Sequence, residues 1–464
     1  MKSSELTKLG VPPGEAMRLA MMAAEEAEGR GVSKKNVRKQ IRGALASPQA
    51  HVDHAYLGKL AAYLLGQQID EPALAQMRDE PAPFQVWGDD IDAQSLAQMQ
   101  NACMLPVAVR GAMMPDAHVG YGLPIGGVLA TRNAVIPYAV GVDIACRMKL
   151  TVLDLPVNTL TAQGERLAKA LREETSFGRQ TFKLRRHHAV MDEDWAVTPV
   201  TQPLKDRAWA QLGTSGGGNH FVEFGEFRVT HGQLGVEPGH YLALLSHSGS
   251  RGPGAAVAEH YSKLAMTLHP ELPKELRYLA WLDLESAEGQ AYWAAMQLMG
   301  RYAAANHACI HQAVAKAVGG RPLLSIENHH NFAWREEHIN ERGAIEPLIV
   351  HRKGATPAGA GVLGIIPGSM ASPAYIVRGK GVEAALDSAS HGAGRRFSRS
   401  EAKESFTWSD TNRLLAERGV TLLSAGLDEA PQAYKDIDAV MAAQRALVEM
   451  VAHFDPKLVR MAGG

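Results

Sequence analysis

The sequence predicts an α+β fold, in which helices and strands are mixed without the regular alternation of a doubly wound sheet. Two observations support this prediction. Residues 1–80 have helix-forming composition and spacing, as in GEAMRLAMMAAEEAEGR and HVDHAYLGKLAAYLLGQ. Residues 81–464 instead combine short β-branched runs, broken by Gly and Pro, with a few long helical segments. We therefore expect an N-terminal helical extension at 1–80 and one larger domain at 81–464.

The first half of the larger domain is expected to be rich in strands. EPAPF at 80–84 predicts a linker, and the short runs from Val86 to Leu155 predict strands joined by tight loops. A helix is predicted near 160–175. The polar, basic stretch GRQTFKLRRHHAVMDEDW that follows predicts an exposed insertion. NHFVEF and HYLALLSHSGS predict two further strands.

The second half begins with a long helix. Residues 286–318 have helical spacing, and Gly319-Gly320 suits the left-handed backbone that often ends a helix. Strands are predicted again from Leu323 to Arg378. The segment KDIDAVMAAQRALVEMVAHF predicts one more amphipathic helix near the end of the chain.

Composition limits the classes of function. The 464 residues carry a net charge of -1, so no overall field draws the chain to nucleic acid or to an anionic membrane, and any polyanion must meet a local patch. Three cysteines, Cys103, Cys146 and Cys309, do not make a disulfide framework and favour a reducing, cytoplasmic setting. No stretch approaches the roughly 20 apolar residues of a membrane span, so we expect no membrane partner.

Potential metal ligands stand in glycine-bordered loops that follow apolar, strand-like runs. Such loops are where a rigid scaffold presents a site. One carboxylate, one thiol and several imidazoles suit Mn, Zn or Fe(II) better than Mg or Ca. Taken singly, each His is more often a hydrogen-bonding residue, and Cys146 a buried apolar one, so spacing leaves both interpretations open. The loops carry Asp143, Cys146, Asn219, His220, His247, Ser248, Arg251, His329, His330 and Asn331.

Three segments point to phosphate. HRKGAT at 351–356, IIPGSM at 365–370 and SASHGAGRRFSR at 388–399 combine glycine turns with Ser, Lys and Arg. Glycine lets backbone N–H groups approach a phosphate, and the basic side chains supply charge. None has the spacing of a P-loop. His391 is either an acceptor of a phosphoryl or nucleotidyl group or a residue that merely ends a strand.

Together these motifs resemble the RtcB family of RNA-splicing ligases, from about Pro83 to Val459. MPDAHVGYGLPIGGV, VGVDIAC, LGTSGGGNHFVE, HSGSRG, HHN, RKGA, GIIPGSM, SHGAGR and DEAPQAYKDIDAV occur in the family's order. The resemblance implies an RtcB-like catalytic domain at 81–464. It also implies an enzyme of RNA repair or tRNA splicing. Such an enzyme joins RNA 2′,3′-cyclic phosphate or 3′-phosphate ends to 5′-hydroxyl ends, using GTP and Mn²⁺ through a histidine–GMP intermediate.

The resemblance further implies a role for individual residues. Two manganese ions would share Cys146, and His391 would carry GMP. Arg251 would help to hold RNA phosphate. The remaining metal ligands would be Asp143 and His220 at one ion and His247 and His330 at the other. The nucleotide contacts would come from Asn219, Glu223, Ser369, His391, Gly392, Gly394 and Arg395.

The sequence departs from the family's pattern at several positions. Arg147 follows Cys146 where Gly is usual, and either supplies a cation near the metals or crowds the substrate path. The chain ends at Arg460 to Gly464 without the family's terminal Lys-Gly pair, which removes an expected nucleotide contact. Ala371 replaces a usual Gly. His307 replaces a usual Arg, which would remove a contact to RNA or phosphate.

Other basic and imidazole residues have simpler interpretations. A stripe at helical spacing in the extension is either a solvated face or an RNA-binding face. It comprises Lys34, Lys35, Arg38, Lys39 and Arg42. Lys183, Arg185 and Arg186 of the insertion have the same two interpretations, and His187 and His188 are expected to be exposed. His307 and His311, one helical turn apart, are expected to pack rather than to bind metal.

Two other functions compete with ligation. One is a dinuclear-metal RNA phosphoesterase or cyclic phosphodiesterase that keeps the metals without nucleotidyl transfer, and the missing terminal Lys favours it. The other is an RNA-binding protein without turnover.

Overall fold

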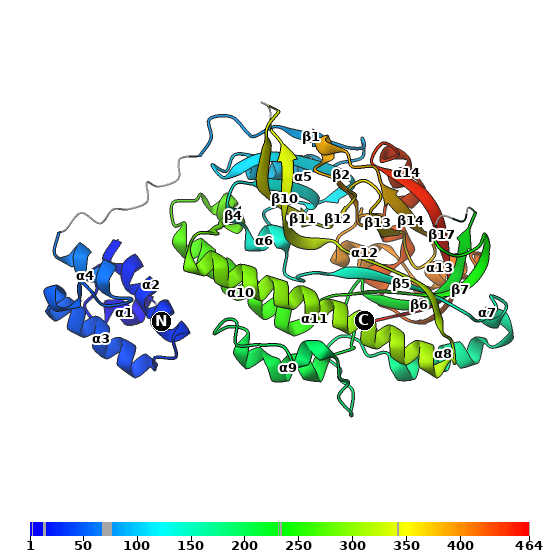
Figure 1. Cartoon of the computed structure of the whole chain (residues 1–464), viewed down its shortest axis with the longest axis horizontal. Helices are drawn as coiled ribbons and strands as arrows, with labels where there is room; N and C mark the ends of the chain where they lie inside the picture. The colour runs from blue at the N-terminus through cyan, green and yellow to red at the C-terminus, as the bar shows by residue number, and fades with distance from the viewer. Residues whose placement is uncertain are drawn as a thin grey trace.

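The computed structural model describes residues 1, 3–12, 15–66, 77–230, 232, 234–340 and 343–463. Helices and strands both contribute substantially, and the sheets mix parallel and antiparallel pairs, so the predicted α+β class is confirmed (Figure 1). No helix in the described ranges is long and apolar enough to cross a membrane. All three cysteines are free and buried, as expected for a chain without a disulfide framework.

The described part of the N-terminal extension forms a small helical bundle. Its helices contact one another and enclose an apolar core of their own, which includes Leu6, Leu19, Ile41 and Leu60. The last predicted residues of the extension include 67–76, which lie outside the described residues. The bundle comprises α1 (Ser3–Thr7), α2 (Glu15–Gly29), α3 (Lys34–Ala46), η1 (Pro48–His51) and α4 (Gly58–Leu64).

One of the two main sheets has five strands. Strands were predicted throughout Val86 to Leu155, but α5 (Ala93–Cys103) interrupts them. Asp92 begins α5 by accepting a hydrogen bond from the Ser95 N–H at 2.8 Å. The strand order is β1 (Phe84–Val86), β2 (Ala108–His118), β3 (Ile125–Thr131), β11 (Ile345–Lys353) and β10 (Asn331–Ile339).

A larger sheet holds most of the remaining strands, including those predicted at NHFVEF and HYLALLSHSGS. Its neighbours are antiparallel except where β16 pairs with β17. The order is β13 (Leu363–Pro367), β14 (Ala374–Gly379), β17 (Val448–Met461), β6 (Phe221–Val229), β7 (Gly239–Ser248), β5 (Arg147–Leu153) and β9 (Pro322–His329), with β16 (Thr421–Ser424) on β17. Two short pairs complete the strands: β4 (Ala134–Val135) with β8 (Leu282–Asp283), and β12 (Ala355–Pro357) with β15 (Ser388–Ser390).

The predicted helix near the end of the chain is wrong for most of its length. Only α14 (Ile437–Ala443) is helical, and β17 (Val448–Met461) follows it. β17 lies between β14 and β6, and pairs with β14 over residues 448–454 and with β6 over residues 452–461. The hydrogen bonds and buried area of a central strand therefore outweigh the helix propensity of its Ala and Met residues.

Long helices cover the sheets. The predicted helix at 286–318 is confirmed as α11 (Ala287–Ala317), after which Gly319 has a φ of +62°. The helix predicted near 160–175 is confirmed as α8 (Gly164–Glu174). The other helices are α6 (Pro137–Val140), α7 (Thr159–Ala162), α9 (Lys205–Gln211), α10 (Arg251–Leu268), α12 (Arg399–Ser405) and α13 (Trp408–Glu417). The 3-10 turns are η2 (Ala189–Met191), η3 (Gln202–Leu204), η4 (Lys274–Leu279), η5 (Glu383–Ala385), η6 (Leu427–Glu429) and η7 (Pro431–Ala433).

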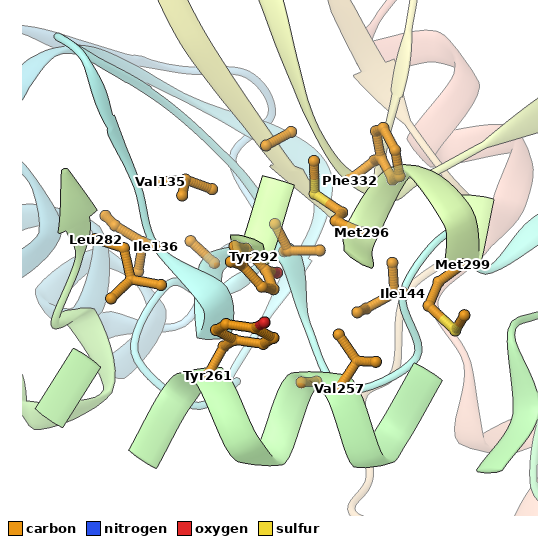
Figure 2. Close-up of a cluster of buried hydrophobic side chains, with 14 of the residues drawn as sticks. Val135, Ile136, Ile144, Val257, Tyr261, Leu282, Tyr292, Met296, Met299 and Phe332 are labelled. Atoms are coloured by element: carbon orange, nitrogen blue, oxygen red, sulfur yellow. The ribbon is translucent and has the colours of Figure 1, made fainter. Parts of the chain in front are cut away.

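The main apolar core lies between α10 and α11 and supports the loop that carries the first predicted metal ligands. Tyr261 of α10 and Tyr292 of α11 lie with ring centroids 5.2 Å apart (Figure 2). Ile144 points into the same cluster and is fully buried. Because its neighbours in sequence include Asp143 and Cys146, packing of Ile144 fixes the position of that loop.

Candidate metal and nucleotide site

The five predicted metal ligands come together from four separate segments of the chain. Asp143 and Cys146 precede β5, and His220 precedes β6. β5 pairs on one side with β7, which carries His247, and on the other with β9, after which His330 follows. The register of the larger sheet therefore places the ends of these strands side by side.

The ligand atoms form two groups that share one thiol. Cys146 Sγ lies 3.3 Å from His220 Nε2 and 3.1 Å from His247 Nε2. His220 Nε2 lies 3.0 Å from Asp143 Oδ2, and His247 Nε2 lies 3.2 Å from His330 Nε2. One group is thus Asp143, Cys146 and His220, and the other is Cys146, His247 and His330. A thiolate in both groups could bridge two cations.

The backbone of the loop that carries Cys146 adopts an uncommon conformation and is bonded to a second ligand-carrying segment. Ala145 has a φ of +56°, which is uncommon for a residue with a side chain. Its N–H donates to the carbonyl of Asn331 at 2.7 Å, which ties the loop to the segment that carries His330. A Cβ on Gly216 would lie 1.6 Å from His220 Nδ1, so only glycine allows this ring its place. Such local strain is typical of functional sites.

Burial and neighbouring charges shift the pKa values of the candidate metal ligands. Burial lowers the pKa of His247 to about 3 and that of His330 well below its ordinary value, so both rings are neutral. His247 Nδ1–H donates to the Asn219 carbonyl at 3.1 Å, which leaves a lone pair on Nε2. Burial, together with the charge of Asp143, raises the pKa of the Cys146 thiol well above its ordinary value.

The donor set fits a transition-metal pair. Burial opposes ionisation of Asp143, but the hydrogen bond and charge of His220 outweigh it and keep the carboxyl pKa below its usual value. His220 Nδ1 and His330 Nδ1 are buried without hydrogen-bond partners among the described residues. A carboxylate, a thiol and three imidazoles suit Mn, Zn or Fe(II).

His391 lies against this cluster and is held by a carboxylate. It follows β15 directly, and its ring centroid is 4.9 Å from that of His330. Asp116 Oδ2, at the far end of β2, lies 2.7 Å from His391 Nδ1 and accepts from the N–H groups of His391 at 3.0 Å and Gly392 at 3.2 Å. With its proton on Nδ1, the ring has a free lone pair on Nε2. A Cβ on Gly394 would lie 2.2 Å from the Asp116 carbonyl, so this close approach requires glycine.

One cavity of about 1260 Å³ joins the metal-ligand groups, His391 and the predicted nucleotide contacts. The three phosphate-directed segments all reach its wall, through Lys353 and Gly354, through Gly368, and through the turn after His391. The predicted nucleotide residues on the wall are Asn219, Glu223, Ser369, His391, Gly392, Gly394 and Arg395. The volume is ample for a nucleotide together with part of a second substrate.

The cavity wall also carries a buried carboxyl and a guanidinium held by hydrogen bonds. Burial raises the pKa of Glu223 on β6 well above its ordinary value, which favours the neutral carboxyl. Arg395 donates to the Asp428 carbonyl at 2.7 Å and pairs with Glu429 at 3.3 Å. Ser369 Oγ lies 3.0 Å from Ser372 Oγ. The wall therefore offers several hydrogen-bonding groups.

Comparison with known proteins identifies the family. The family model described as tRNA-splicing ligase RtcB matches residues 98–462. The chain belongs to the RtcB family. The chain is 35% identical to RNA-splicing ligase RtcB of Escherichia coli (strain K12) over 412 residues, which cover 80% of this chain and 95% of that protein.

Two further relatives show the same coverage. The tRNA-splicing ligase RtcB of Nanoarchaeum equitans is 33% identical over 438 residues, covering 79% of this chain and 91% of its own. RNA-splicing ligase RtcB of Mycobacterium tuberculosis is 31% identical over 427 residues, which cover 77% of this chain and 98% of that protein. The resemblance drawn from the motifs is thus confirmed, and α1 to α4 lie outside the residues that the family model matches.

Arg147, a departure from the RtcB pattern, turns away from the cavity. Its guanidinium pairs with Glu327 at 3.1 Å and donates to the Gly300 carbonyl of α11 at 3.2 Å. Both partners, Glu327 on β9 and Gly300 on α11, lie outside the cavity wall, which Cys146 lines. Arg147 does not line the cavity, so of the two alternatives left open for it the structure gives no support to crowding of the substrate path. Its charge still acts on the buried thiol, as a minor contribution that lowers the Cys146 pKa.

The chain end also takes a structural role. Arg460 Nη1 donates to the carbonyls of Leu171 at 2.6 Å, Arg172 at 2.8 Å and Thr175 at 3.0 Å, and so satisfies the end of α8. Met461 lies on the cavity wall and belongs to the same small apolar cluster as Met370.

The helix histidines pack, as expected. His307 Nδ1 lies 2.7 Å and His311 Nε2 lies 2.8 Å from the hydroxyl of Ser246, in a fully buried network between α11 and β7. Neither belongs to a group of metal-ligand atoms among the described residues. Ala371 packs in a small core beside Leu415.

The residues predicted to bind RNA or to be exposed differ in how deeply they are buried. Arg251 is mostly buried, donates to Thr214 Oγ1 at 3.1 Å and does not line the cavity. Arg186 is half-buried against the Gly213 carbonyl, which contradicts its expected exposure, because its guanidinium also covers the Phe182 ring at 3.9 Å. His187 is exposed, as expected, and His188 is only partly so because it caps η2.

Sequence reasoning singled out neither Asp116 nor His118, and included Lys353 only as part of the phosphate-directed segment HRKGAT. Asp116 and His118 belong to the MPDAH motif, and an acid two residues before a His was a usable signal. Burial lowers the pKa of His118 to about 4. Lys353, in the RKGA motif, donates to the Tyr121 carbonyl, and burial lowers its pKa to about 7. These three groups extend the candidate site beyond the residues predicted from the motifs.

Proposed function

We propose that the chain is an RNA ligase, an enzyme that joins RNA 2′,3′-cyclic phosphate or 3′-phosphate ends to 5′-hydroxyl ends with GTP and two Mn²⁺ ions. The observation that carries this proposal is the ring of His391, fixed by Asp116 at Nδ1 with Nε2 free, against the shared-thiol metal groups. The names of the relatives, RNA-splicing or tRNA-splicing ligases, support it. The chain is expected to act in the cytoplasm in RNA repair or tRNA splicing.

His391 is the nucleophile of the first step. Its Nε2 lone pair attacks the α-phosphorus of GTP, a P–N bond forms, and the bond to the β-phosphate oxygen breaks to release pyrophosphate. The positive charge that develops on the imidazole is stabilised by Asp116, which accepts the Nδ1–H hydrogen bond throughout. The geometry therefore assigns Asp116 as a positioning residue for His391.

The next steps transfer GMP to RNA and seal the strand. Water opens the cyclic phosphate to a 3′-phosphate, whose oxygen attacks the GMP phosphorus and restores free His391. The 5′-hydroxyl of the second end then attacks the activated 3′-phosphate, loses its proton, and expels GMP. Two easier displacements thereby replace one difficult condensation.

The metals would be held by Asp143, Cys146, His220, His247 and His330. Bound there, they neutralise charge on the phosphate oxygens and lower the pKa of water or hydroxyl nucleophiles. Of this chain's own groups, Asn219 keeps the His247 lone pair directed at the cluster. Glu223, Ser369 and Arg395 are assigned to the nucleotide, and Arg251 to RNA phosphate.

The two competing functions would leave some of the site's residues without a role. A dinuclear phosphoesterase has no need for a histidine held by a buried aspartate beside the metals, and a protein that only binds RNA needs neither. The Asp116–His391 pair, with Asp116 fully buried, thus favours ligation.

Labelled GTP tests the proposal. Wild-type protein incubated with Mn²⁺ and α-labelled GTP is expected to acquire an acid-labile, alkali-stable GMP label, and His391→Ala is expected to acquire none. His311→Ala is the matched control, because this buried imidazole lies outside the cavity wall. Wild type should also join a 2′,3′-cyclic phosphate end to a 5′-hydroxyl end. Absence of both label and joining would leave the phosphoesterase as the better function.

A further inference from the structure

Helix α3 of the N-terminal bundle has one strongly basic face. Its sequence, KKNVRKQIRGALA, contains five basic residues and no acidic one. Val37, Ile41 and Ala44 are buried on the face that packs in the bundle. The basic residues occupy the i, i+4 rows of the other side, and all are exposed. We call this set the α3 basic face: Lys34, Lys35, Arg38, Lys39 and Arg42.

This arrangement does not favour the helix itself. Like charges at i and i+4 repel, and Lys34 and Lys35 stand in the first turn, where the helix dipole favours acids. Other exposed helices of this chain pair their basic residues at this spacing, as in Lys263 with Glu259 at 2.6 Å. On α3 only Arg38 has an acidic partner among the described residues, Glu5 at 2.6 Å. The remaining four cations have no ion-pair partner in the described part of the chain.

The bundle presents this face to solvent. Its acidic residues concentrate on α2. Burial raises the pKa of Glu25 on α2, and the charge of Lys263 on α10 opposes this shift only as a minor contribution, which places this side of α2 near α10. In Figure 1, α2 lies nearer to α10 than α3 does. The bundle also has its own apolar core and lies outside the residues that the family model matches. The α3 basic face is therefore an exposed surface that no part of the described residues covers.

We propose that the α3 basic face binds the phosphate backbone of the RNA substrate outside the catalytic cavity. The proposal rests on the proposed function, because RNA is the polyanion on which that function acts. Compact cations such as Lys suit backbone contact rather than base reading. Lys34 to Arg42 extends over about 12 Å of helix, comparable with three or four phosphates of one strand at about 3.4 Å each. A polyanion would relieve the repulsion along this face.

The test uses the full chain and a fluorescent RNA stem–loop. The face variant carries Lys34→Gln, Lys35→Gln, Lys39→Gln and Arg42→Gln, and keeps Arg38 with its Glu5 contact. A charge-matched control carries Lys8→Gln, Lys59→Gln, Lys169→Gln and Lys274→Gln, which are exposed positions outside α3. Kd is measured at several salt concentrations, and thermal unfolding checks that both variants fold.

The face variant is expected to bind RNA about tenfold or more weakly, and the slope of log Kd against log salt is expected to fall by about 3, since each phosphate contact contributes about 0.7–0.9. The control should stay within about twofold of wild type. A Lys→Arg version at 34, 35 and 39 should bind as wild type does. Equal Kd and slope in the face variant and the control would overturn the proposal, as would competition by polyglutamate as effective as that by RNA.

Failure here is distinguishable from failure of the ligase assignment. The face variant should form the GMP label at the wild-type rate and join the stem–loop with a raised KM and an unchanged kcat. If wild type forms no label but the face variant loses RNA affinity, the ligase assignment fails and the RNA-binding face stands. If the label forms and RNA affinity is unchanged, the reverse holds.

Discussion

Asp116 Oδ2 lies 2.7 Å from His391 Nδ1, across 275 residues of sequence. The same oxygen accepts two backbone N–H groups of the turn that carries His391, so carboxylate, backbone and ring form one rigid unit. This pairing fixes the tautomer in which Nε2 is nucleophilic, and Asp116 itself is not among the residues that line the cavity. The chemistry assigned to His391 therefore depends on a residue in a different sheet.

Replacing Asp116 by Asn is expected to slow His391 guanylation by about 10²–10⁴-fold, because the neutral amide oxygen keeps the backbone N–H contacts but stabilises the positive charge on the imidazole less than the carboxylate does. The rate of label formation from GTP measures this effect. Metal content and thermal stability should be close to wild type. Guanylation of Asp116→Asn at the wild-type rate would show that the pair has no positioning role.

Loss of the shared thiol should affect both metal groups. Cys146→Ser is expected to reduce bound manganese from about two ions per chain to less than one, since each ligand contributes to both affinity and geometry. Cys309→Ser is the matched control, because Cys309 is also buried and free but stands on α11. Metal analysis after gel filtration gives the ratio. Full occupancy in Cys146→Ser would contradict a bridging thiolate.

Metal affinity should rise with pH. The Cys146 thiol has a pKa well above its ordinary value without metal, whereas the pKa of His247 is lowered to about 3. Between pH 6 and 8 the thiol must therefore lose a proton to bind a cation, while His247 and His330 lose none. Apparent affinity at the Cys146, His247 and His330 group should increase about tenfold per pH unit. Calorimetry in buffers of different ionisation enthalpy counts the released proton, and a flat profile would contradict this assignment.

Glu223 should set the choice of base. Guanine presents N–H donors that a buried carboxyl can accept, and a site built for such donors discriminates strongly against a base that lacks them. Glu223→Gln is expected to reduce kcat/KM for guanylation by about 10², with little change in the small reaction with ATP. Glu226→Gln, on the same strand but bonded to His240, is the control. Unchanged preference for GTP would assign the base contact elsewhere.

The buried Lys353 is expected to lower the stability of the fold while contributing to RNA joining. Burial lowers its pKa to about 7, so the cost of the buried ammonium is full below pH 7 and disappears as pH rises toward the unfolded value near 10.4. Lys353→Met is therefore expected to raise Tm by about 2–4 °C at pH 6.5 and by less at pH 9.5. RNA joining should fall by about 10², because the cavity loses a cation. Thermal scans at both pH values test the sign, and an advantage that grows with pH would contradict it.

Local patterns gave reliable elements where the periodicity was long and uninterrupted. The helical spacing of residues 286–318 predicted α11, and Gly319 ended it as expected. The final segment failed because its Ala and Met residues favour a helix in isolation, whereas β17 (Val448–Met461) is central in the larger sheet. Helix propensity depends on adjacent residues, whereas the position between two strands that β17 occupies depends on parts of the chain far away in sequence.

The sequence by itself determined the family, the ligand types and the glycine turns, because each of these is written in a few adjacent residues. Only the tertiary structure decided that Cys146 belongs to two groups, that Arg147 turns to Glu327, and that Asp116 holds His391. Those relationships depend on the register and pairing of strands far apart in the chain. Register is fixed by the burial of whole sheet faces, which no short motif encodes.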